Sequence, residues 1–516
     1  MVFSSNVFLF LFLPIFLGLY YLSGQRYRNL LLLVASYIFY AWWRPDFLLL
    51  FVGITYWNYW FGLRIKARLD AGDKRWAFRL LWIGIIGNLS TLGYFKYANF
   101  GAEVLGALLA PLGINTFTLE TIFLPLGISF YVFHALSYIV DIYRKDATPT
   151  NNFIDFAAFV ALFPHLVAGP ILRYSQLAPQ LRQRTHSLEM FSLGVCRFML
   201  GFIMKVLIAD QLAPINVLFI SEGSLQLSDA WFGLVVSTLQ LYFDFAGYSH
   251  MALGLALMMG FRFPENFNQP YVSQSITEFW SRWHMTLAHF LRDYVYMPLV
   301  RKRIAGAMPA LVYTMLLSGL WHGASFAFIC WGLFFGLGMV IERKFNLATK
   351  VTTPYRLGRN LRTGLLIILS MPLFFTNDLR HSLDIYQALF GFNGLGSLEL
   401  YVLGASKMAM SFVAVALCWL QVRVGLAPLR RLEALLATIR NPSSAAQEGA
   451  LVDVQAMLAA PTGRDLQPLQ AELASLWEHN ARVVARARAH ASDLNHALKK
   501  PLALLSAQVF MAMGLA

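Results

Sequence analysis

The sequence contains few charged residues and few cysteines for its length. Only 13% of its 516 residues are Asp, Glu, Lys or Arg, whereas a soluble domain usually contains about 25%. The three cysteines, Cys196, Cys330 and Cys418, lie far apart in apolar stretches. This spacing argues against a disulfide framework or a cysteine metal site, so we expect the cysteines to act as small hydrophobic residues.

Common catalytic motifs are also absent. The chain has no phosphate-binding GxxxxGK[ST] loop, no GxGxxG after a strand and no GxSxG elbow. The histidines form no HExxH pair and no CxxC is present, so we predict neither a metal nor a bound cofactor. The net charge of +14 lies mainly in short loops between apolar segments. Such loops orient a membrane protein, so we predict no nucleic-acid partner.

Long apolar stretches make up most of the chain. Hydrophobic residues account for 58% of the composition, and many runs approach the ~20 residues that a helix needs to cross a bilayer. We therefore predict an all-α, polytopic integral membrane protein surrounded by lipid. The candidate spans are 5–23, 28–43, 46–63, 79–95, 120–142, 190–208, 230–259, 306–342, 362–377 and 400–422. The run 306–342 is too long for one upright helix, so it is either a tilted helix or two short passes.

The basic loops set the expected orientation. Cytoplasmic loops of membrane proteins are enriched in Lys and Arg, so we place these loops in the cytoplasm and the N-terminus in the periplasm. The basic loops are 64–79, 144–145, 301–303, 342–344 and 430–431.

This orientation requires that some segments do not cross the bilayer. The segment 154–172 contains the helix-breaking sequence FPHLVAGPIL, and 261–300 is too polar to face lipid. We expect both to be re-entrant and to line an intramembrane funnel.

The domain organisation follows the composition. Residues 1–425 form the predicted multi-pass membrane domain, 426–500 a helical cytoplasmic segment, and 501–516 a candidate final membrane helix. No internal repeat is visible, which disfavours a transporter built from inverted repeats.

One polar stretch, SQSITEFWSRWHMTLAHFLRDYVY at 273–296, contains a histidine without an obvious local partner. Read as a single helix, it places Glu278, Arg282, His289 and Asp293 on one stripe, as two pairs spaced four residues apart. His284 lies on neither the charged nor the apolar stripe. Its neighbours on such a helix are small, which would leave room for a ligand.

A second histidine, His322, lies in the apolar stretch LSGLWHGASFAFICWG at 317–332. Small residues around it, including Ser318, would let another helix or a substrate approach closely. Two interpretations stay open from the pattern alone. His322 forms a hydrogen bond across a helix bundle, or it acts as a general base, because histidine has a pKa of about 6.5. For the other buried polar positions we expect structural pairing, and these are Lys96, His165, Arg173, Asp244 and His250.

Several segments occur in the order in which they occur in a known family. They include GYFKYANF, FPHLVAGPILR, LYFDFAGYS, GFRFPENF and the two histidine stretches. Over about residues 1–425 the chain resembles the membrane-bound O-acyltransferases, most closely the bacterial branch that O-acetylates alginate. The resemblance implies a many-helix fold with re-entrant segments and a tunnel. It also implies two site histidines, His284 and His322, of which His322 is catalytic. One departure is YSHMALG, where His250 replaces the usual acidic residue.

The resemblance implies a function for the chain. We expect an enzyme of the bacterial inner membrane that takes an acetyl group from a cytoplasmic donor, with acetyl-CoA as the candidate. The acetyl group would reach an exopolysaccharide, alginate above all, with periplasmic acetyltransferases as partners. His322 would accept a proton from the acceptor hydroxyl, and His284 would position or polarise the acyl group. Candidate supporting residues are Trp283, Arg282, Trp321, Asp244 and Ser318.

Three alternatives remain at this stage. The enzyme could act on another polymer, such as cellulose. A transporter or export channel would also fit the membrane segments, and so would a scaffold of a polysaccharide secretion complex. The scaffold predicts that His322→Ala leaves acetylation intact.

Overall fold

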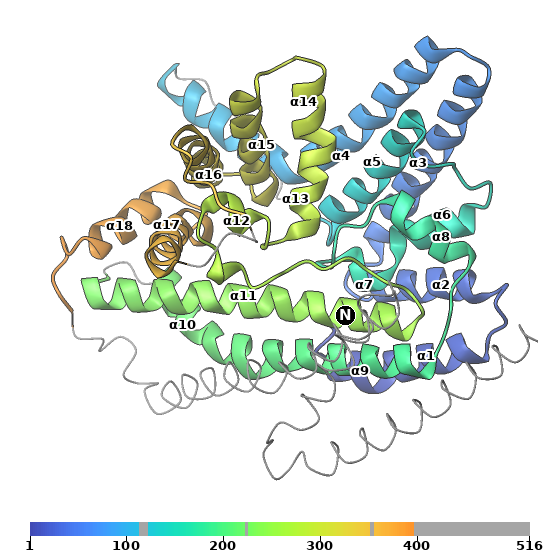
Figure 1. Ribbon diagram of the computed structural model, residues 1–516, viewed down its shortest axis with the longest axis horizontal. Coiled ribbons are helices and arrows are strands. Elements are labelled where there is room, and N and C mark those ends of the chain that lie inside the picture. The colour runs from blue at the N-terminus through green and yellow to red at the C-terminus, as the bar shows by residue number, and fades with distance from the viewer. Residues whose placement is uncertain (113–121, 222–224, 351–355, 397–516) are drawn as a thin grey trace, which may run out of the picture. The chain divides into compact units, whose positions relative to one another are not determined.

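The computed structural model describes residues 1–112, 122–221, 225–350 and 356–396 (Figure 1). All regular secondary structure within these residues is helical, which confirms the predicted all-α class. The helices are α1 (Leu13–Leu22), α2 (Arg28–Ala41), α3 (Asp46–Asp70), α4 (Lys74–Leu109), α5 (Ile128–Arg144), α6 (Phe153–Ala161), α7 (Phe163–Leu166), α8 (Tyr174–Arg182), α9 (Leu188–Ile203), α10 (Asp210–Ser221), α11 (Leu227–Met258), α12 (Ile276–Trp280), α13 (Met285–Leu291), α14 (Met297–Arg301), α15 (Ala307–His322), α16 (Phe326–Lys344), α17 (Leu357–Phe375) and α18 (Leu379–Leu389).

Two helical stretches in the described part of the chain are long and apolar enough to cross a bilayer, namely Leu188–Ser221 and Phe326–Lys344. Phe8–Leu22 and Arg28–Ala41 are shorter apolar helices. Most other predicted spans coincide with helices α3, α4, α5, α11 and α17, without meeting both conditions. The predicted span 400–422 and the predicted segments 426–500 and 501–516 lie outside the described residues.

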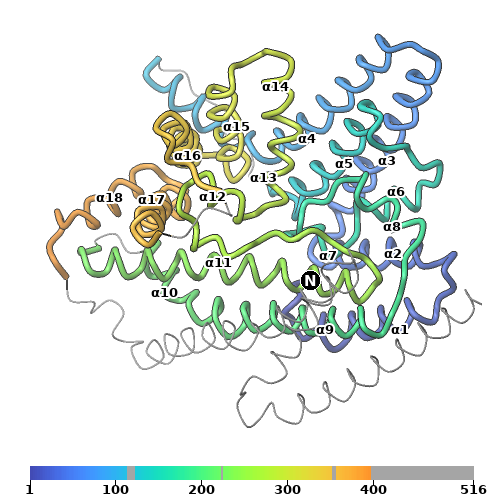
Figure 2. Tube along the Cα trace, in the orientation of Figure 1, coloured from blue at the N-terminus to red at the C-terminus, as the bar shows by residue number. Residues whose placement is uncertain are grey.

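Close contact between glycines joins α9 to α11, which lie side by side (Figures 1 and 2). A Cβ atom added to Gly254 of α11 would lie 2.5 Å from the backbone nitrogen of Phe198 on α9. One added to Gly201 of α9 would overlap the carbonyl oxygen of Gly247. Small residues at such crossings let helix backbones approach closely and make up for the weak hydrophobic drive inside a membrane.

The predicted run 306–342 consists of two helices, α15 and α16, joined by a break at residues 323–325. The pair is a helical hairpin, because Met315 of α15 packs against Gly332 of α16 and Val312 against Gly336. A Cβ atom at Gly319 would overlap the carbonyl oxygen of Phe328 on α16. The small residues before His322 therefore admit a neighbouring helix.

The single helix expected over 273–296 is wrong. The stretch folds as α12, a turn, α13 and a π-helical turn at Arg292–Tyr296. His284 lies in the turn with φ 42° and ψ 51°, in the left-handed region that side chains rarely adopt. This turn ends the helical periodicity, so the stripes expected from a continuous helix do not form.

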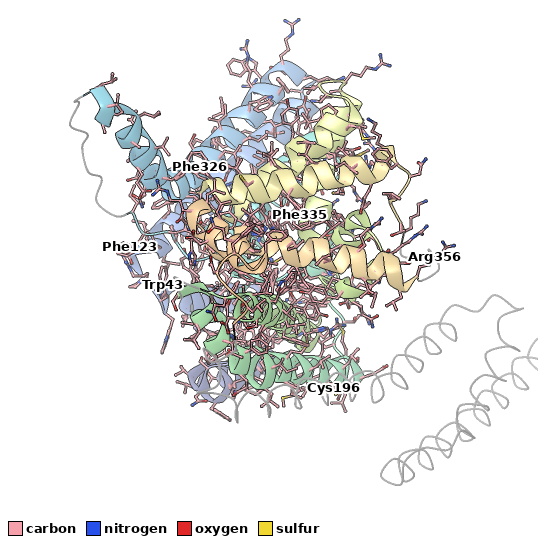
Figure 3. All side chains as sticks on the ribbon, turned by 90° about the vertical axis from the view of Figure 1, so that its left-hand side faces the viewer. Trp43, Phe123, Cys196, Phe326, Phe335 and Arg356 are labelled. Atoms are coloured by element: carbon pink, nitrogen blue, oxygen red, sulfur yellow. The ribbon has the colours of Figure 1, made fainter. Side chains whose placement is uncertain are left out.

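Two hydrophobic clusters form the interior, and they meet near α15. The first joins α1–α8 with the end of α11, and the partly buried Trp321 packs against it. The second joins residues of α10 to α18 and contains Trp331 and Phe335. Phe335 is fully buried, whereas Cys196 of α9 is exposed (Figure 3). The junction of the clusters therefore carries the end of α15 and His322.

Candidate active site

His322 is the last residue of α15 and lies among aromatic rings. Its ring centroid is 4.7 Å from that of Trp321 and 5.0 Å from those of Trp331 and Phe374. Within the described residues, no hydrogen bond joins the imidazole of His322 to another group. The ring is therefore held by packing, and its nitrogens stay available to a substrate.

Helix α4 fixes the end of α15 on which His322 lies. The last carbonyl groups of a helix have no partner inside that helix. Here the Lys96 ammonium donates to the Trp321 carbonyl oxygen, and the Tyr97 hydroxyl donates to the Leu320 carbonyl oxygen at 2.6 Å. The Lys96 nitrogen also lies 5.5 Å from the Trp321 ring centroid. Lys96 is thus bonded, as expected, but to a helix end rather than to a carboxylate.

His284 is buried and bonded to Asn266. Its Nδ1 atom lies 3.0 Å from Asn266 Oδ1, which also accepts hydrogen bonds from the backbone nitrogen of Thr286 at 3.3 Å and the Thr286 hydroxyl at 2.8 Å. A backbone N–H can only donate, which identifies the shared Asn266 atom as the oxygen. His284 must therefore carry its proton on Nδ1, which leaves a lone pair on Nε2.

The Nε2 atom of His284 is buried and has no hydrogen-bond partner among the described residues. The structure surrounds the ring with Phe245, at a centroid distance of 4.8 Å, and with Trp321, at 6.1 Å. These neighbours replace the small residues expected from a continuous helix. The ligand-accessible atom of His284 is consequently an acceptor.

Trp321 lies between the two histidines, since its ring contacts both His322 and His284. Three of the other buried polar atoms that have no partner in the described part of the chain lie on or near α15: Ser318 Oγ, Trp321 Nε1 and Trp331 Nε1. Ser318 precedes His322 by one helical turn, and Trp331 contacts the His322 ring. Buried polar groups in native proteins are nearly always bonded, so free atoms gathered around two histidines indicate a ligand site.

Three other predicted site residues are placed elsewhere. Arg282 donates from Nε to Glu278 Oε1 at 2.9 Å, and Trp283 stacks on Phe279 at 5.5 Å. Asp244 forms an ion pair of 2.6 Å with Lys205. These contacts make Arg282 and Trp283 supports of the turn that holds His284, whereas Asp244 forms an ion pair with Lys205.

The predicted pairing of His289 with Asp293 is wrong. Asp293 pairs instead with Arg173, and with Arg292 at 2.7 Å. The π-helical turn that begins at Arg292 changes the spacing on which the prediction relied.

Other polar positions are bonded within the protein. His165 Nδ1 lies 3.2 Å from Nε2 of His134. His250 Nδ1 accepts from Arg197 Nε at 3.2 Å, and Arg197 also pairs with Glu265. His250 therefore shares the Arg197 guanidinium with the Glu265 carboxylate.

Asn266 was not predicted as a site residue, although it lies in the quoted segment GFRFPENF. Its contact with His284 joins residues 18 positions apart across a non-helical turn. No local spacing in the sequence signals such a contact.

Comparisons with known proteins identify the family of the chain. The model of the MBOAT, membrane-bound O-acyltransferase family, matches residues 144–371, a range that includes both histidines. The chain belongs to this family and is an O-acyltransferase of the membrane. The family assignment therefore identifies the chain as an enzyme, in preference to the transporter and scaffold alternatives.

Particular relatives refine the family assignment. The chain is 55% identical over 397 residues to the probable alginate O-acetylase AlgI of Pseudomonas putida, covering 76% of this chain and 81% of that protein. It is 54% identical over 397 residues to the protein of the same name from Pseudomonas aeruginosa, covering 76% and 75%. A peptidoglycan O-acetyltransferase of Helicobacter pylori is 33% identical over 453 residues, covering 80% and 83%.

Proposed function

We propose that this chain is an inner-membrane O-acetyltransferase that takes an acetyl group from a cytoplasmic donor for the O-acetylation of an exopolysaccharide, with alginate as the polymer. The observation that carries the proposal is the pair of histidines on either side of Trp321, with the free Nε2 of His284 facing no protein partner. The high identity to alginate O-acetylases over three quarters of the chain supports the polymer.

The proposed reaction transfers an acetyl group from a thioester, such as acetyl-CoA, to a hydroxyl. The hydroxyl oxygen attacks the acyl carbonyl carbon while its proton moves to the His322 ring. The C–O bond of the ester forms, the C–S bond breaks, and the departing sulfur takes the proton from His322. Histidine suits this double role because its ring both accepts and returns a proton near neutral pH.

His284 has a narrower role than the sequence suggested. A neutral ring protonated on Nδ1 presents only a lone pair at Nε2, so it accepts a hydrogen bond and cannot polarise a carbonyl. Because the single proton of the reacting hydroxyl goes to His322, we assign His284 to accepting a hydrogen bond from a second donor group of the acceptor, which orients that molecule. The free indole N–H groups of Trp321 and Trp331 are donors, and they supply the hydrogen bonds that stabilise the developing oxyanion.

The expected position of His322 inside the bilayer supports a tunnel that leads to it. Helix α15 has 16 residues and is about 24 Å long at 1.5 Å per residue, shorter than a hydrocarbon core of about 30 Å. A hairpin that enters from the cytoplasm would therefore hold His322 within the bilayer. Phe156, Phe163 and His165, in the segment proposed to be re-entrant, are fully buried in protein, the setting that irregular backbone needs at this depth.

The donor side and the acceptor side need separate partners. We propose that the donor enters between the basic cytoplasmic loops and that periplasmic acetyltransferases receive the acetyl group, with the N-terminus in the periplasm and 426–500 in the cytoplasm. Labelled acetyl-CoA incubated with the protein and its partners tests the donor. An absence of CoA release would exclude acetyl-CoA.

The decisive test of the site is His322→Ala. We expect the acetyl content of the polymer, per molecule of membrane-inserted protein, to fall about 10²–10⁴-fold, the usual contribution of a positioned general base. His289→Ala is the matched control, because it removes a histidine ring that contacts neither Trp321 nor His322 and should leave acetylation unchanged. Normal acetyl content in His322→Ala at normal abundance would overturn the assignment.

A further inference from the structure

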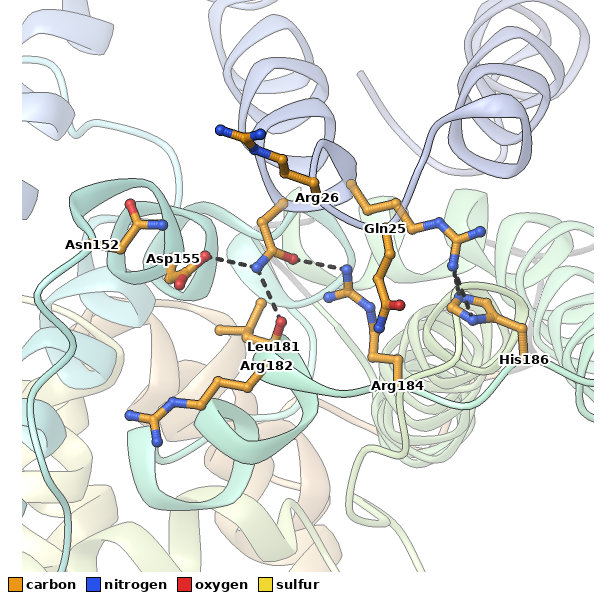
Figure 4. A pocket seen from close by; sticks show the side chains of 10 residues that line it. Gln25, Arg26, Asn152, Asp155, Leu181, Arg182, Arg184 and His186 are labelled. Atoms are coloured by element: carbon orange, nitrogen blue, oxygen red, sulfur yellow. Dashed lines mark hydrogen bonds between the residues drawn. The ribbon is translucent and has the colours of Figure 1, made fainter.

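A basic cavity of about 520 Å³ lies apart from the two histidines, where the ends of several helices meet (Figure 4). It opens between the loop joining α1 to α2, the start of α6, the end of α8 and the loop that leads into α9. The lining residues are Gln25, Arg26, Arg28, Asn29, Asn152, Asp155, Leu181, Arg182, Arg184 and His186. The proposed acetyl transfer uses none of them.

The cavity carries uncompensated positive charge. Four of its lining residues are arginines and one is an aspartate, Asp155, which accepts a hydrogen bond of 2.7 Å from Asn29. Among the described residues, none of the four arginines forms an ion pair within 4.0 Å. Two guanidinium atoms, Arg28 Nε and Arg184 Nη1, are buried and have no hydrogen-bond partner in the same part of the chain. These two N–H groups are therefore available to donate hydrogen bonds to a ligand.

A hydrogen-bond chain holds Arg28 in place. The Tyr20 hydroxyl donates to the Met259 carbonyl oxygen at 2.7 Å, so it must accept from His186 Nε2, 3.0 Å away. His186 Nδ1 is then free to accept from Arg28 Nη1 at 3.2 Å (Figure 4). Arg184 is held in turn by Asn29, whose Oδ1 accepts from Nη2 at 2.8 Å.

The charge state of His186 agrees with this chain. Burial, together with the nearby charges of Arg28 and Arg184, lowers the pKa of the imidazole below its usual value. The ring is therefore neutral at neutral pH, and the four arginines and Asp155 leave the cavity with a net charge of +3.

We propose that this cavity binds a phosphate group, and that the group belongs to the headgroup of an anionic phospholipid. Guanidinium groups present planar pairs of donors that match phosphate oxygens. Basic pockets between membrane helices on the cytoplasmic side are suited to lipid headgroups.

The position of the cavity selects the lipid as the source of the phosphate. Helix α1 ends at Leu22, α2 begins at Arg28, and the candidate span Leu188–Ser221 begins two residues after His186. The cavity is thus level with the ends of apolar helices, where headgroups lie. Leu22 and Leu188, next to the cavity in the sequence, are 85% and 81% exposed and would contact the acyl chains.

The test compares ligands on the purified full-length protein in a neutral detergent. The unfolding midpoint is measured while short-chain phosphatidylglycerol or short-chain phosphatidylcholine is titrated, and in parallel with inorganic phosphate and with CoA. We expect phosphatidylglycerol to raise the midpoint saturably, because a ligand that binds the folded state stabilises it. Phosphatidylcholine and the soluble phosphates should have little effect.

Two double variants locate the effect. Arg28→Gln with Arg184→Gln removes the donors at the base of the cavity, and the apparent affinity for phosphatidylglycerol should fall at least about tenfold, given the strength of hydrogen bonds to charged groups. Arg75→Gln with Arg301→Gln is the control. It removes the same charge from exposed positions at the start of α4 and the end of α14 and should keep the wild-type affinity.

Each outcome bears on the proposal. If both double variants weaken phosphatidylglycerol binding equally, general surface charge causes the effect and the proposed site is overturned. A saturable shift with inorganic phosphate or CoA alone would overturn the lipid as the source. If the variant with Arg28→Gln and Arg184→Gln does not fold, Arg26→Gln with Arg182→Gln at the exposed rim of the cavity replaces it. An unchanged affinity for phosphatidylglycerol in this rim variant would refute the proposal.

Discussion

Replacing Asn266 with alanine tests whether the tautomer of His284 matters. The Asn266 Oδ1 atom accepts from His284 Nδ1, from the Thr286 backbone nitrogen and from the Thr286 hydroxyl, and Nδ2 donates to Ser249 at 3.0 Å. The hydroxyl can rotate to another acceptor, but two buried N–H donors would lose their partner. At about 1–3 kcal/mol for each, the free energy of unfolding should fall by about 2–6 kcal/mol.

Activity per folded molecule should fall as well. Without its acceptor, His284 is free to move its proton to Nε2, which removes the lone pair that orients the acceptor molecule. We expect at least about a tenfold loss of acetyl transfer per folded molecule, less than the ~10²–10⁴-fold contribution of a general base, because His284 orients the acceptor and does not take the proton. The assay measures polymer acetyl content against the amount of folded protein in the membrane.

Asn58→Ala is the matched control for this prediction. Asn58 is equally buried and is bonded to Asn88 at 2.9 Å, far from the histidines in the fold. It should lower stability without changing transfer per folded molecule. The reasoning fails if Asn266→Ala and Asn58→Ala behave alike, with full activity per folded molecule in both.

Two further predictions concern stability, measured as the unfolding midpoint in detergent. Gly319→Ala should lower the free energy of unfolding by about 1–3 kcal/mol, because the added methyl group overpacks against the Phe328 carbonyl. Gly18→Ala is the control: it has open space around it and should be neutral or slightly stabilising. Equal unfolding midpoints for the two variants would contradict the close helix contact. Glu278→Gln should cost about 3–5 kcal/mol by leaving the buried Arg282 without its partner. The exposed pair of Lys66 and Asp70 supplies the comparison, because Lys66→Gln should cost less than about 1 kcal/mol, and a similar loss in both variants would refute the difference.

The positions of the helices could be predicted from the sequence because apolar length depends on local composition. The helices α1, α2 and α9 follow apolar runs that any window along the chain detects. The pairing of Glu278 with Arg282 also followed from local spacing. Such features depend only on the helical repeat, so tertiary contacts elsewhere in the fold do not change them.

The rest depended on contacts between distant segments. His284 adopts a left-handed conformation that no helical periodicity indicates, and its partner Asn266 lies across a turn. Arg28 and Arg184 are 156 positions apart in the sequence, yet the fold brings them to one cavity. Tertiary contacts between loops have no period in the sequence, which is why the site histidines could be named but their roles could not be separated.

The break at residues 323–325 has a consequence for the path of the chain through the bilayer. One helix over 306–342 would place its two ends on opposite sides of the bilayer, whereas a hairpin of α15 and α16 would return the chain to the face from which it entered. The Arg343 side chain donates to the Tyr296 hydroxyl at 3.2 Å, so the end of α16 lies beside the π-helical turn at Arg292–Tyr296, which precedes α14 and α15 in the chain. A hairpin that enters and leaves by one face would keep the basic clusters 301–303 and 342–344 in the same compartment, as the predicted orientation requires. The break at residues 323–325 would thus decide on which side of the bilayer α17 begins.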